Sequence, residues 1–514
     1  MALTSLLFVE FMAAVIICYF CVPKKYQWVV VLLANIIFYV SNGPKYIAYI
    51  LVTTALTYSG ARVLEKLNLE SKAELKEISD AETKTKKRQF FIKRKKRIIA
   101  AFIFVTMMIW IVIKYGSFYK IGGLSLVLPI GMSFYTFQAV GYMIDVYRGK
   151  YPAQKNFIKY FAFVSYFPHI MQGPFSRYDI LGESILEEHN FSYDRLCAGA
   201  ARIIWGFFKK IVIADQIGIS VDKIIGNYSD YTGFNILCVV FLYAIQIYAD
   251  FSGYMDIVCG FSNILGIKLQ ENFIQPYFSK SIEEYWRRWH LTLCQWFRDY
   301  LFYPVSMSKP VQNLGKKSRA KLGSKWGRYI PVYVALILVW TCTGLWHGAN
   351  VTYLIWGYLN FIVIACSTHW SEYYEKGKSL FHIKSGNPLW EGFRMLRTFA
   401  LVAFFRFFAF SDTVSKALGM IGRIFTDFNI GQNLVHPCSV FPGLSKIQIL
   451  IVLLGIVALV VVDILNETKK WEDVKAKSPL VARAIIYAAM LLLTLLVVPA
   501  LGAVNTGDFM YANF

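Results

Sequence analysis

The chain has 514 residues, of which 56% are hydrophobic and only 17% are charged. A soluble protein carries charge on about a quarter of its residues, so this composition excludes a soluble multidomain protein and predicts one integral-membrane domain over residues 1–514. Lysine and arginine number 54 against 32 acidic residues, a formal charge of +22, which is typical of basic cytoplasmic loops and makes nucleic-acid binding the lesser interpretation.

The first apolar stretch, from Leu3 to Val22, has neither the basic start nor the small-residue cleavage site of a signal peptide. It is therefore expected to remain as a membrane span. Cys18 and Cys21 form a CxxC pair within it, but no second pair or nearby histidine accompanies them, so we predict no metal site. The other cysteines are scattered and predict no disulfide framework.

Apolar stretches that can cross a bilayer recur along the chain, since a span needs about 20 such residues. We place candidate spans at residues 3–22, 28–42, 44–61, 98–117, 126–147, 232–250, 331–347, 350–366, 396–411, 447–465 and 485–502. Between residues 155 and 285 the apolar pieces are short and broken, and such helices need protein or a water-filled cavity beside them at membrane depth. The sequence therefore predicts an all-α polytopic protein with about 11–12 transmembrane helices, plus re-entrant and interfacial helices.

Clusters of basic residues indicate which loops face the cytoplasm. They occur at residues 84–97, 316–328, 376–397 and 469–483; binding of anionic lipid or RNA is the alternative interpretation. Counting spans from these loops places both termini outside the cytoplasm. We divide the chain into N-terminal spans over 1–127 with a basic loop at about 62–97, a candidate catalytic core over 128–366, and C-terminal spans with an extracytoplasmic tail over 367–514.

A histidine within a span is a functional candidate, because an ionisable group is costly there. His347 lies in Gly344-Leu345-Trp346-His347-Gly348, on the order of 25 Å from the cytoplasmic surface at a rise of 1.5 Å per residue. Its imidazole can take a proton from a hydroxyl or attack a thioester, and the flanking glycines allow close approach of another chain. The alternative is a histidine hydrogen-bonded between helices.

A second candidate, His290, belongs to an aromatic and basic segment that runs from Glu283 to Tyr300. Interpreted as one helix, this segment places His290, Cys294 and Arg298 on one face. Arginines beside a histidine suit the phosphates of a cytosolic acyl donor, whereas a membrane-interface helix would explain them without catalysis. The candidates for donor binding are Arg287, Arg288 and Arg298.

Further polar residues stand in apolar stretches and are candidates for lining the cavity, namely Gln138, Asp250 and Asp256. The two aspartates can pair with the arginines of the aromatic segment or orient a histidine, and Asp145 can pair with Arg148 at i and i+3. His169, in a broken segment, either lines the cavity or is a hydrogen-bonded structural histidine. No Walker motif, HExxH or serine-hydrolase elbow accompanies these residues.

These blocks follow one another in a recognisable order: Leu128 to Gln138, Phe167 to Pro174, Tyr248 to Tyr254, Tyr285 to Tyr303 and Gly344 to Gly348. On these residues the chain resembles the membrane-bound O-acyltransferase family, in its bacterial branch of alginate O-acetylation proteins, peptidoglycan O-acetyltransferases and teichoic-acid D-alanyl transfer proteins. The resemblance implies a ring of helices around a central funnel, with His347 at the funnel base and His290 as its companion on the cytoplasmic side. Leu301 to Ser306 lacks a glycine pair that alginate-type relatives often have, which leaves the acceptor open.

The implied function is transfer of a small acyl group, expected to be acetyl, across the bacterial cytoplasmic membrane. The donor would be a cytosolic thioester, acetyl-CoA or an acyl carrier protein, with no bound cofactor. The acceptor would be an extracytoplasmic polysaccharide or cell-wall polymer, reached directly or through an SGNH-type acyltransferase. His347 would act as general base or transient nucleophile, and His290 would orient the donor or assist proton transfer. The alternatives are D-alanyl transfer to teichoic acid and, from another class, a transporter or flippase.

The chain ends on an aromatic tail, from Asp508 to Phe514. It resembles an aromatic C-terminal motif, centred on a tyrosine, in this bacterial branch. The resemblance implies that Tyr511 relays the acyl group once a base such as His347 activates its phenol, whose pKa is ordinarily about 10. The alternative is an aromatic anchor at the membrane interface.

Overall fold

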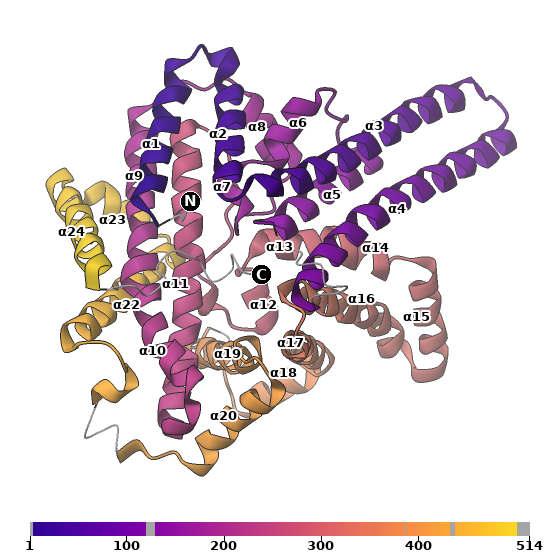
Figure 1. Ribbon diagram of the computed structural model, residues 1–514. Coiled ribbons are helices and arrows are strands. Elements are labelled where there is room, and N and C mark those ends of the chain that lie inside the picture. Colours follow the sequence, from indigo (N-terminus) through magenta and orange to yellow (C-terminus); the bar gives the residue numbers. More distant parts are fainter. Residues whose placement is uncertain (1–3, 120–128, 385, 432–436, 501–514) are drawn as a thin grey trace. The chain divides into compact units, whose positions relative to one another are not determined.

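A computed structural model describes residues 4–119, 129–384, 386–431 and 437–500 of the chain (Figure 1). Helices make up its regular structure, and within these residues the only strand-like feature is an isolated antiparallel bridge between Phe273 and Trp289. The predicted all-α class is therefore confirmed.

The described residues divide into two compact units. Of the described residues, unit 1 comprises those within 4–202 and 258–270, and unit 2 comprises those within 203–257 and 271–500. Two long helices, α9 (Tyr193–Phe207) and α11 (Gly233–Leu265), contribute residues to both units. The prediction of one domain over the whole chain stays a prediction.

Unit 1 is built around a long helical hairpin and the shorter helices that pack on it. Its helices are α1 (Leu6–Cys21), α2 (Gln27–Ser41), α3 (Ile47–Glu77), α4 (Ala81–Tyr119), α5 (Met132–Arg148), α6 (Phe157–Val164), α7 (Phe167–Ile170) and α8 (Glu183–Leu186). Figure 1 shows α3 and α4 side by side as the hairpin. Helix α5 packs against both, and its side chains are buried along almost the whole helix.

Unit 2 holds the later helices and the predicted histidine segments. They are α10 (Asp215–Gly226), α12 (Ile282–Trp286), α13 (Leu291–Phe297), α14 (Tyr303–Ser306), α15 (Lys309–Leu322), α16 (Ser324–His347), α17 (Val351–His369), α18 (Ser371–Leu380), α19 (Pro388–Ala409), α20 (Val414–Thr426), α22 (Lys446–Glu467), α23 (Trp471–Lys477) and α24 (Leu480–Ala500). Helix α16 packs between α15 and α17, and α17 packs on α12 and α19.

Seven helices among the described residues are long and apolar enough to cross a membrane. They are Pro44–Glu77, Ala81–Gly116, Gly233–Leu265, Ser324–His347, Val351–His369, Lys446–Glu467 and Leu480–Val497. Every predicted span falls at least in part on a helix of the structure. The predicted spans that are not among these seven helices fall on α1, α2, α5 and α19. The chain is a multi-pass membrane protein, while its total of about 11–12 spans stays a prediction.

The broken character predicted for residues 155–285 is confirmed over much of that range. Helices α6, α7 and α8 have 8, 4 and 4 residues, and two π-helical segments, Tyr178–Gly182 and Phe208–Ala214, interrupt the regular pattern. Such π-helical segments are rare and occur frequently at functional sites. Whether these segments enter the membrane from one side stays a prediction.

Candidate active site

His347 is the last residue of α16, and the next helix closes tightly over it. A Cβ atom at Gly344 would lie 2.8 Å from the carbonyl oxygen of Tyr353, and one at Gly348 would lie 2.5 Å from its ring. No side chain fits in either place, so these glycines allow α17 to approach the end of α16, as predicted. The His347 side chain is buried as a result, with 6% of the residue exposed.

Aromatic rings enclose His347 on several sides. The centroids of Trp346 and Trp356 lie 4.9 Å from the imidazole centroid, both nearly perpendicular to it, and the Tyr353 ring stacks at 6.0 Å. Trp356 in turn contacts Trp286 of α12 at 5.6 Å. Such a wall keeps bulk water away and strengthens electrostatic interactions within the site.

His290 stands at a break in the chain rather than within a helix. Helix α12 ends at Trp286, α13 begins at Leu291, and His290 between them adopts a left-handed conformation with φ of +48°. The prediction of one continuous helix from Glu283 to Tyr300 is therefore wrong. A left-handed non-glycine residue costs on the order of 1–2 kcal/mol, so long-range contacts must impose this conformation.

Those contacts come from the segment just after α11. The backbone N–H of Leu291 donates to the carbonyl of Asn272 at 3.0 Å, and the N–H of Ile274 donates to the carbonyl of Arg288 at 3.0 Å. These two bonds flank the bridge between Phe273 and Trp289. The pairing clamps the His290 turn against a second chain segment and offsets the cost of its left-handed backbone.

Asn272 also sets the protonation pattern of the His290 ring. Its Oδ1 accepts from the backbone N–H of Thr292 at 3.2 Å and from the Thr292 hydroxyl at 2.9 Å, and lies 3.1 Å from His290 Nδ1. An oxygen that accepts from a backbone N–H requires Nδ1 to carry its proton, which leaves the lone pair on Nε2. His290 lies outside the candidate spans, and burial lowers the pKa of its imidazole to about 3, so the ring is neutral at pH 7.

The two predicted histidines belong to one aromatic cluster. The Trp346 centroid lies 6.0 Å from that of His290 and 4.9 Å from that of His347, so one indole lies next to both imidazoles. The cluster extends to Trp286, whose Nε1 donates to Asn360 Oδ1 at 2.9 Å. The structure thus brings His290 and His347 together, and their catalytic roles stay predictions.

The three arginines proposed for donor binding have different surroundings. Arg288 is held by Glu467 at 2.6 Å and by Glu284 at 2.7 Å, so its charge is already matched by two carboxylates. Arg287 and Arg298 are exposed and pair with Glu283 and Asp299, at 3.0 and 2.9 Å. Arg288 therefore ties α12 to the end of α22, and the three side chains make no shared contact in the described interactions.

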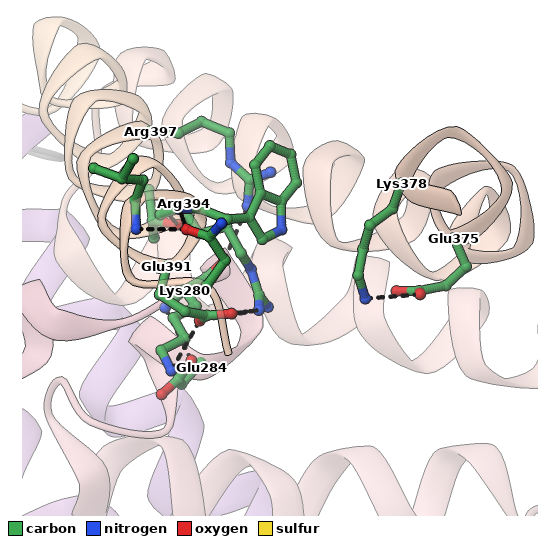
Figure 2. A network of polar contacts seen from close by, with 11 residues as sticks. Lys280, Glu284, Glu375, Lys378, Glu391, Arg394 and Arg397 are labelled. Atoms are coloured by element: carbon green, nitrogen blue, oxygen red, sulfur yellow. Dashed lines mark hydrogen bonds and ion pairs between the residues drawn. The ribbon is translucent and has the colours of Figure 1, made fainter. Parts of the chain in front are cut away.

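A second ionic network fixes the start of α12, as Figure 2 shows. The Lys280 ammonium lies 2.9 Å from Glu391 of α19, its backbone N–H donates to Glu284 at 2.9 Å, and its carbonyl accepts from Arg397 at 2.9 Å. The hydrogen bond from Lys280 lowers the pKa of Glu391. This network positions the helix that leads directly into the His290 turn.

The aspartates predicted to line the cavity have lysine partners. Asp250 lies 2.7 Å from Lys210, and Asp256 lies 2.5 Å from Lys209. These ion pairs form because the π-helical segment Phe208–Ala214 carries both lysines, buried, toward this face of α11. The predicted contacts with arginines of the aromatic segment or with a histidine stay predictions. Lys210 also contacts Asp215 at 2.8 Å, so one ammonium serves two carboxylates.

Two predicted polar residues belong to α5 in unit 1. Gln138 is buried, and its Nε2 donates to the carbonyl of Phe163 at 3.2 Å. Asp145 contacts Lys150 at 3.8 Å and accepts from the Tyr151 hydroxyl at 3.3 Å, and its predicted contact with Arg148 stays a prediction. Tyr511 lies outside the described residues. Among the described residues, no group of three or more histidine, cysteine, aspartate or glutamate side chains is placed to hold a metal ion.

Asn272 is the site residue that sequence reasoning missed. It lies in a polar stretch between α11 and the aromatic segment, where an asparagine is an ordinary loop residue. No spacing or periodicity distinguishes it, because its partner His290 is 18 positions away and reached only through the chain pairing at the bridge.

Comparison with known proteins bears directly on this region. Residues 153–323 match the family model of the membrane-bound O-acyltransferases. The chain is 42% identical over 230 residues to the probable alginate O-acetylase AlgI of Pseudomonas syringae pv. tomato, a match covering 45% of this chain and 41% of that protein. It is 30% identical over 268 residues to the peptidoglycan O-acetyltransferase of Helicobacter pylori, covering 47% and 48% respectively.

A third relative is the teichoic acid D-alanyltransferase of Bacillus subtilis, 29% identical over 267 residues, with 50% of this chain and 63% of that protein covered. In each of these comparisons the match spans less than two thirds of the relative's own length.

Proposed function

The chain belongs to the membrane-bound O-acyltransferase family, and from that premise we propose that it transfers a small acyl group, acetyl, from a cytosolic thioester to hydroxyl groups of an extracytoplasmic polysaccharide or cell-wall polymer. The observation that carries the proposal is the pair of buried histidines around Trp346. An imidazole in an aromatic enclosure suits proton transfer from a hydroxyl, which is the hard step of O-acylation at neutral pH.

In the proposed reaction an acceptor hydroxyl attacks the carbonyl carbon of the thioester while His347 takes the hydroxyl proton. The new C–O bond forms, the C–S bond breaks, and the leaving thiolate receives the proton from the imidazolium. In the covalent variant His347 first displaces the thiol to form an acyl-imidazole, which the hydroxyl then attacks. His290, with its lone pair on Nε2, orients the donor or assists this proton transfer.

The donor is proposed to be acetyl-CoA or an acyl carrier protein, with no bound cofactor, and it reaches the site from the cytoplasm. The exposed arginines Arg287 and Arg298 support this side of the proposal, because guanidinium groups suit phosphates. We place the protein in the bacterial cytoplasmic membrane with both termini outside. The outside partner would be an SGNH-type acyltransferase or the polymer itself.

Purified full-length protein in lipid vesicles tests the proposal. Acetyl-CoA or an acetylated carrier protein is supplied, and thioester cleavage and acceptor acetylation are measured for wild type and for His347→Gln. We expect the variant to remain folded, because glutamine is a polar side chain of similar size, and to lose the activity. The matched control is His369→Gln at the end of α17, which should keep it. Wild-type turnover by His347→Gln would contradict the assignment.

The same vesicles distinguish the alternatives. The match to a teichoic acid D-alanyltransferase supports D-alanyl transfer as the second candidate, so a D-alanyl carrier protein is tested beside the acetyl donors. Movement of substrate across the bilayer without thioester cleavage would instead indicate a transporter or flippase.

The acyl relay through Tyr511 is a separate part of the proposal. We expect Tyr511→Phe to leave the protein folded and to abolish delivery to the outside acceptor, since the phenol oxygen would carry the acyl group. An acyl mass on the C-terminal peptide during turnover would support the relay. Full acceptor modification by Tyr511→Phe would reduce the tail to an interfacial anchor.

A further inference from the structure

A short turn in unit 1 buries two polar side chains on the same side. The N–H of Gly173 donates to the carbonyl of His169 at 2.8 Å, so the helical path of α7 continues beyond Ile170. His169 and Gln172 are therefore at i and i+3 of one turn and project in similar directions. Both residues have no exposed surface.

The polar atoms of these two side chains make no hydrogen bond of good geometry among the residues that the structure describes, although a backbone group of Tyr166 lies beside the His169 ring. These atoms are Nδ1 and Nε2 of His169 and Nε2 and Oε1 of Gln172. Both interpretations of His169, a cavity-lining residue and a hydrogen-bonded structural histidine, stay predictions. Buried polar groups in proteins are almost always paired, and each exception needs a physical reason.

The same region shows what a satisfied buried amide looks like. Asn35 is also fully buried, yet its Nδ2 lies 3.1 Å from the carbonyl of Ala162 and 3.2 Å from the Ser165 hydroxyl. Its Oδ1 accepts from the N–H of Phe167 at 2.9 Å. Packing in this region thus pairs the Asn35 amide completely, whereas one further polar group could satisfy the side chains of His169 and Gln172.

The surroundings restrict the chemistry of that group. The Tyr166 ring stacks on the His169 ring at 5.8 Å, while its hydroxyl is engaged with Ser262 at 2.8 Å. Between residues 160 and 176 the chain has no aspartate, glutamate, lysine or arginine. An ion bound there would find no counter-charge on this segment, and an apolar group would leave the same atoms unpaired.

A neutral imidazole offers one donor and one acceptor, and a primary amide offers two donors and one acceptor. The matching group must both donate and accept without charge, and a hydroxyl does so. We propose that His169 and Gln172 form a buried binding site for a neutral hydroxyl group, supplied by an ordered water molecule or by a small polyol.

The test uses the full-length protein purified in detergent, by electron cryomicroscopy and by thermal unfolding with glycerol or mannitol as probes. The wild type should show ordered density within hydrogen-bonding distance of both side chains. The double variant His169→Leu/Gln172→Leu should lose this density and unfold several degrees lower. If the hydroxyl comes from water, the difference in unfolding temperature between wild type and double variant should be the same at all probe concentrations. A polyol source predicts a saturable rise in the unfolding temperature of the wild type alone.

Two variants calibrate the stability readout. Met171→Leu, on the same turn, removes no hydrogen-bonding group of this kind and should behave as wild type, whereas Asn35→Leu breaks bonds that the structure defines and should be destabilised with or without probe. Absence of density together with a double variant at least as stable as wild type would overturn the proposal, because leucines then relieve unpaired burial. Neither readout depends on acyl transfer, so failure here leaves the proposed function untouched.

Discussion

His290 and His169 are both buried histidines next to short helices, yet the protein treats them differently. At His290 a second chain segment supplies Asn272, whose oxygen lies 3.1 Å from Nδ1 and fixes the proton there. At His169 neither ring nitrogen makes a hydrogen bond of good geometry among the described residues. The first ring is therefore oriented by the fold itself, and for the second we propose a partner from outside the chain. Burial alone does not distinguish a catalytic candidate from a binding site; the partners do.

The largest expected effect comes from removing the group that orients His290. Asn272→Leu should lower kcat/KM for acyl transfer by about 10²–10⁴-fold, the usual contribution of a positioned acid or base. Thr292→Val is the matched control, because it removes one bond to Asn272 and leaves the bond to His290. A loss in Thr292→Val as large as in Asn272→Leu would show that packing, not ring orientation, is at stake.

A positioning role also predicts a change in pH dependence. In Asn272→Asp a carboxylate would replace the amide beside Nδ1 and favour the imidazolium, raising the pKa of His290. Activity that needs neutral His290 should then fail at a higher pH than in wild type as the pH is lowered. An unchanged acidic limb in the pH–rate profile would contradict this role.

The buried lysines differ from both histidines, because their partners are carboxylates that act through charge. Lys210 serves both Asp250 and Asp215, so Lys210→Met should lower the free energy of unfolding by about 3–5 kcal/mol, as removal of one member of a buried ion pair does. Asp250→Asn should lower the free energy of unfolding by less, because Lys210 still pairs with Asp215. Denaturation in detergent that ranks the two variants in the opposite order would contradict this account.

The pH dependence of stability sharpens the comparison further. The pKa of His290 is lowered by burial to about 3 in the folded state, against about 6.5 when unfolded. Between these values the unfolded chain binds more protons, so stability should fall as the pH drops below about 6.5. His290→Gln should reduce the difference in bound protons between the unfolded and folded states by about one, and the slope of stability against pH should fall accordingly. An identical slope in wild type and variant would mean that burial does not lower the pKa of this ring.

The smallest effect is expected at the exposed arginines. Arg298→Ala should raise the KM for the thioester donor a few-fold, with little change for the acceptor, and the difference should shrink at high salt because exposed charges are screened. Lys416→Ala, a partly buried lysine on α20 that pairs with Asp412, serves as the control. Equal donor KM values for Arg298→Ala and wild type at low salt would reduce the segment to an interfacial helix.

Some features of this protein can be predicted from its sequence without a tertiary structure. The helices follow from apolar stretches, because a chain in lipid must satisfy its backbone hydrogen bonds within each segment. The close approach at Gly344 and Gly348 also follows from local composition, since only glycine leaves room for a neighbouring helix. His347 and His290 stand out in their own neighbourhoods, one between glycines and the other among tryptophans and arginines.

The remaining features arise from residues far apart in the sequence. Periodicity predicts a continuous helix through His290, whereas pairing with the Asn272 segment breaks it and imposes a left-handed residue. Lys210, the partner of Asp250, lies 40 positions away on a π-helical segment, and the same segment carries Lys209, the partner of Asp256. The sequence by itself determined an all-helical membrane protein with two candidate histidines, because those depend on local composition. Only the tertiary structure decided which polar atoms find partners, because hydrogen bonds and ion pairs depend on distances between segments that no local pattern encodes.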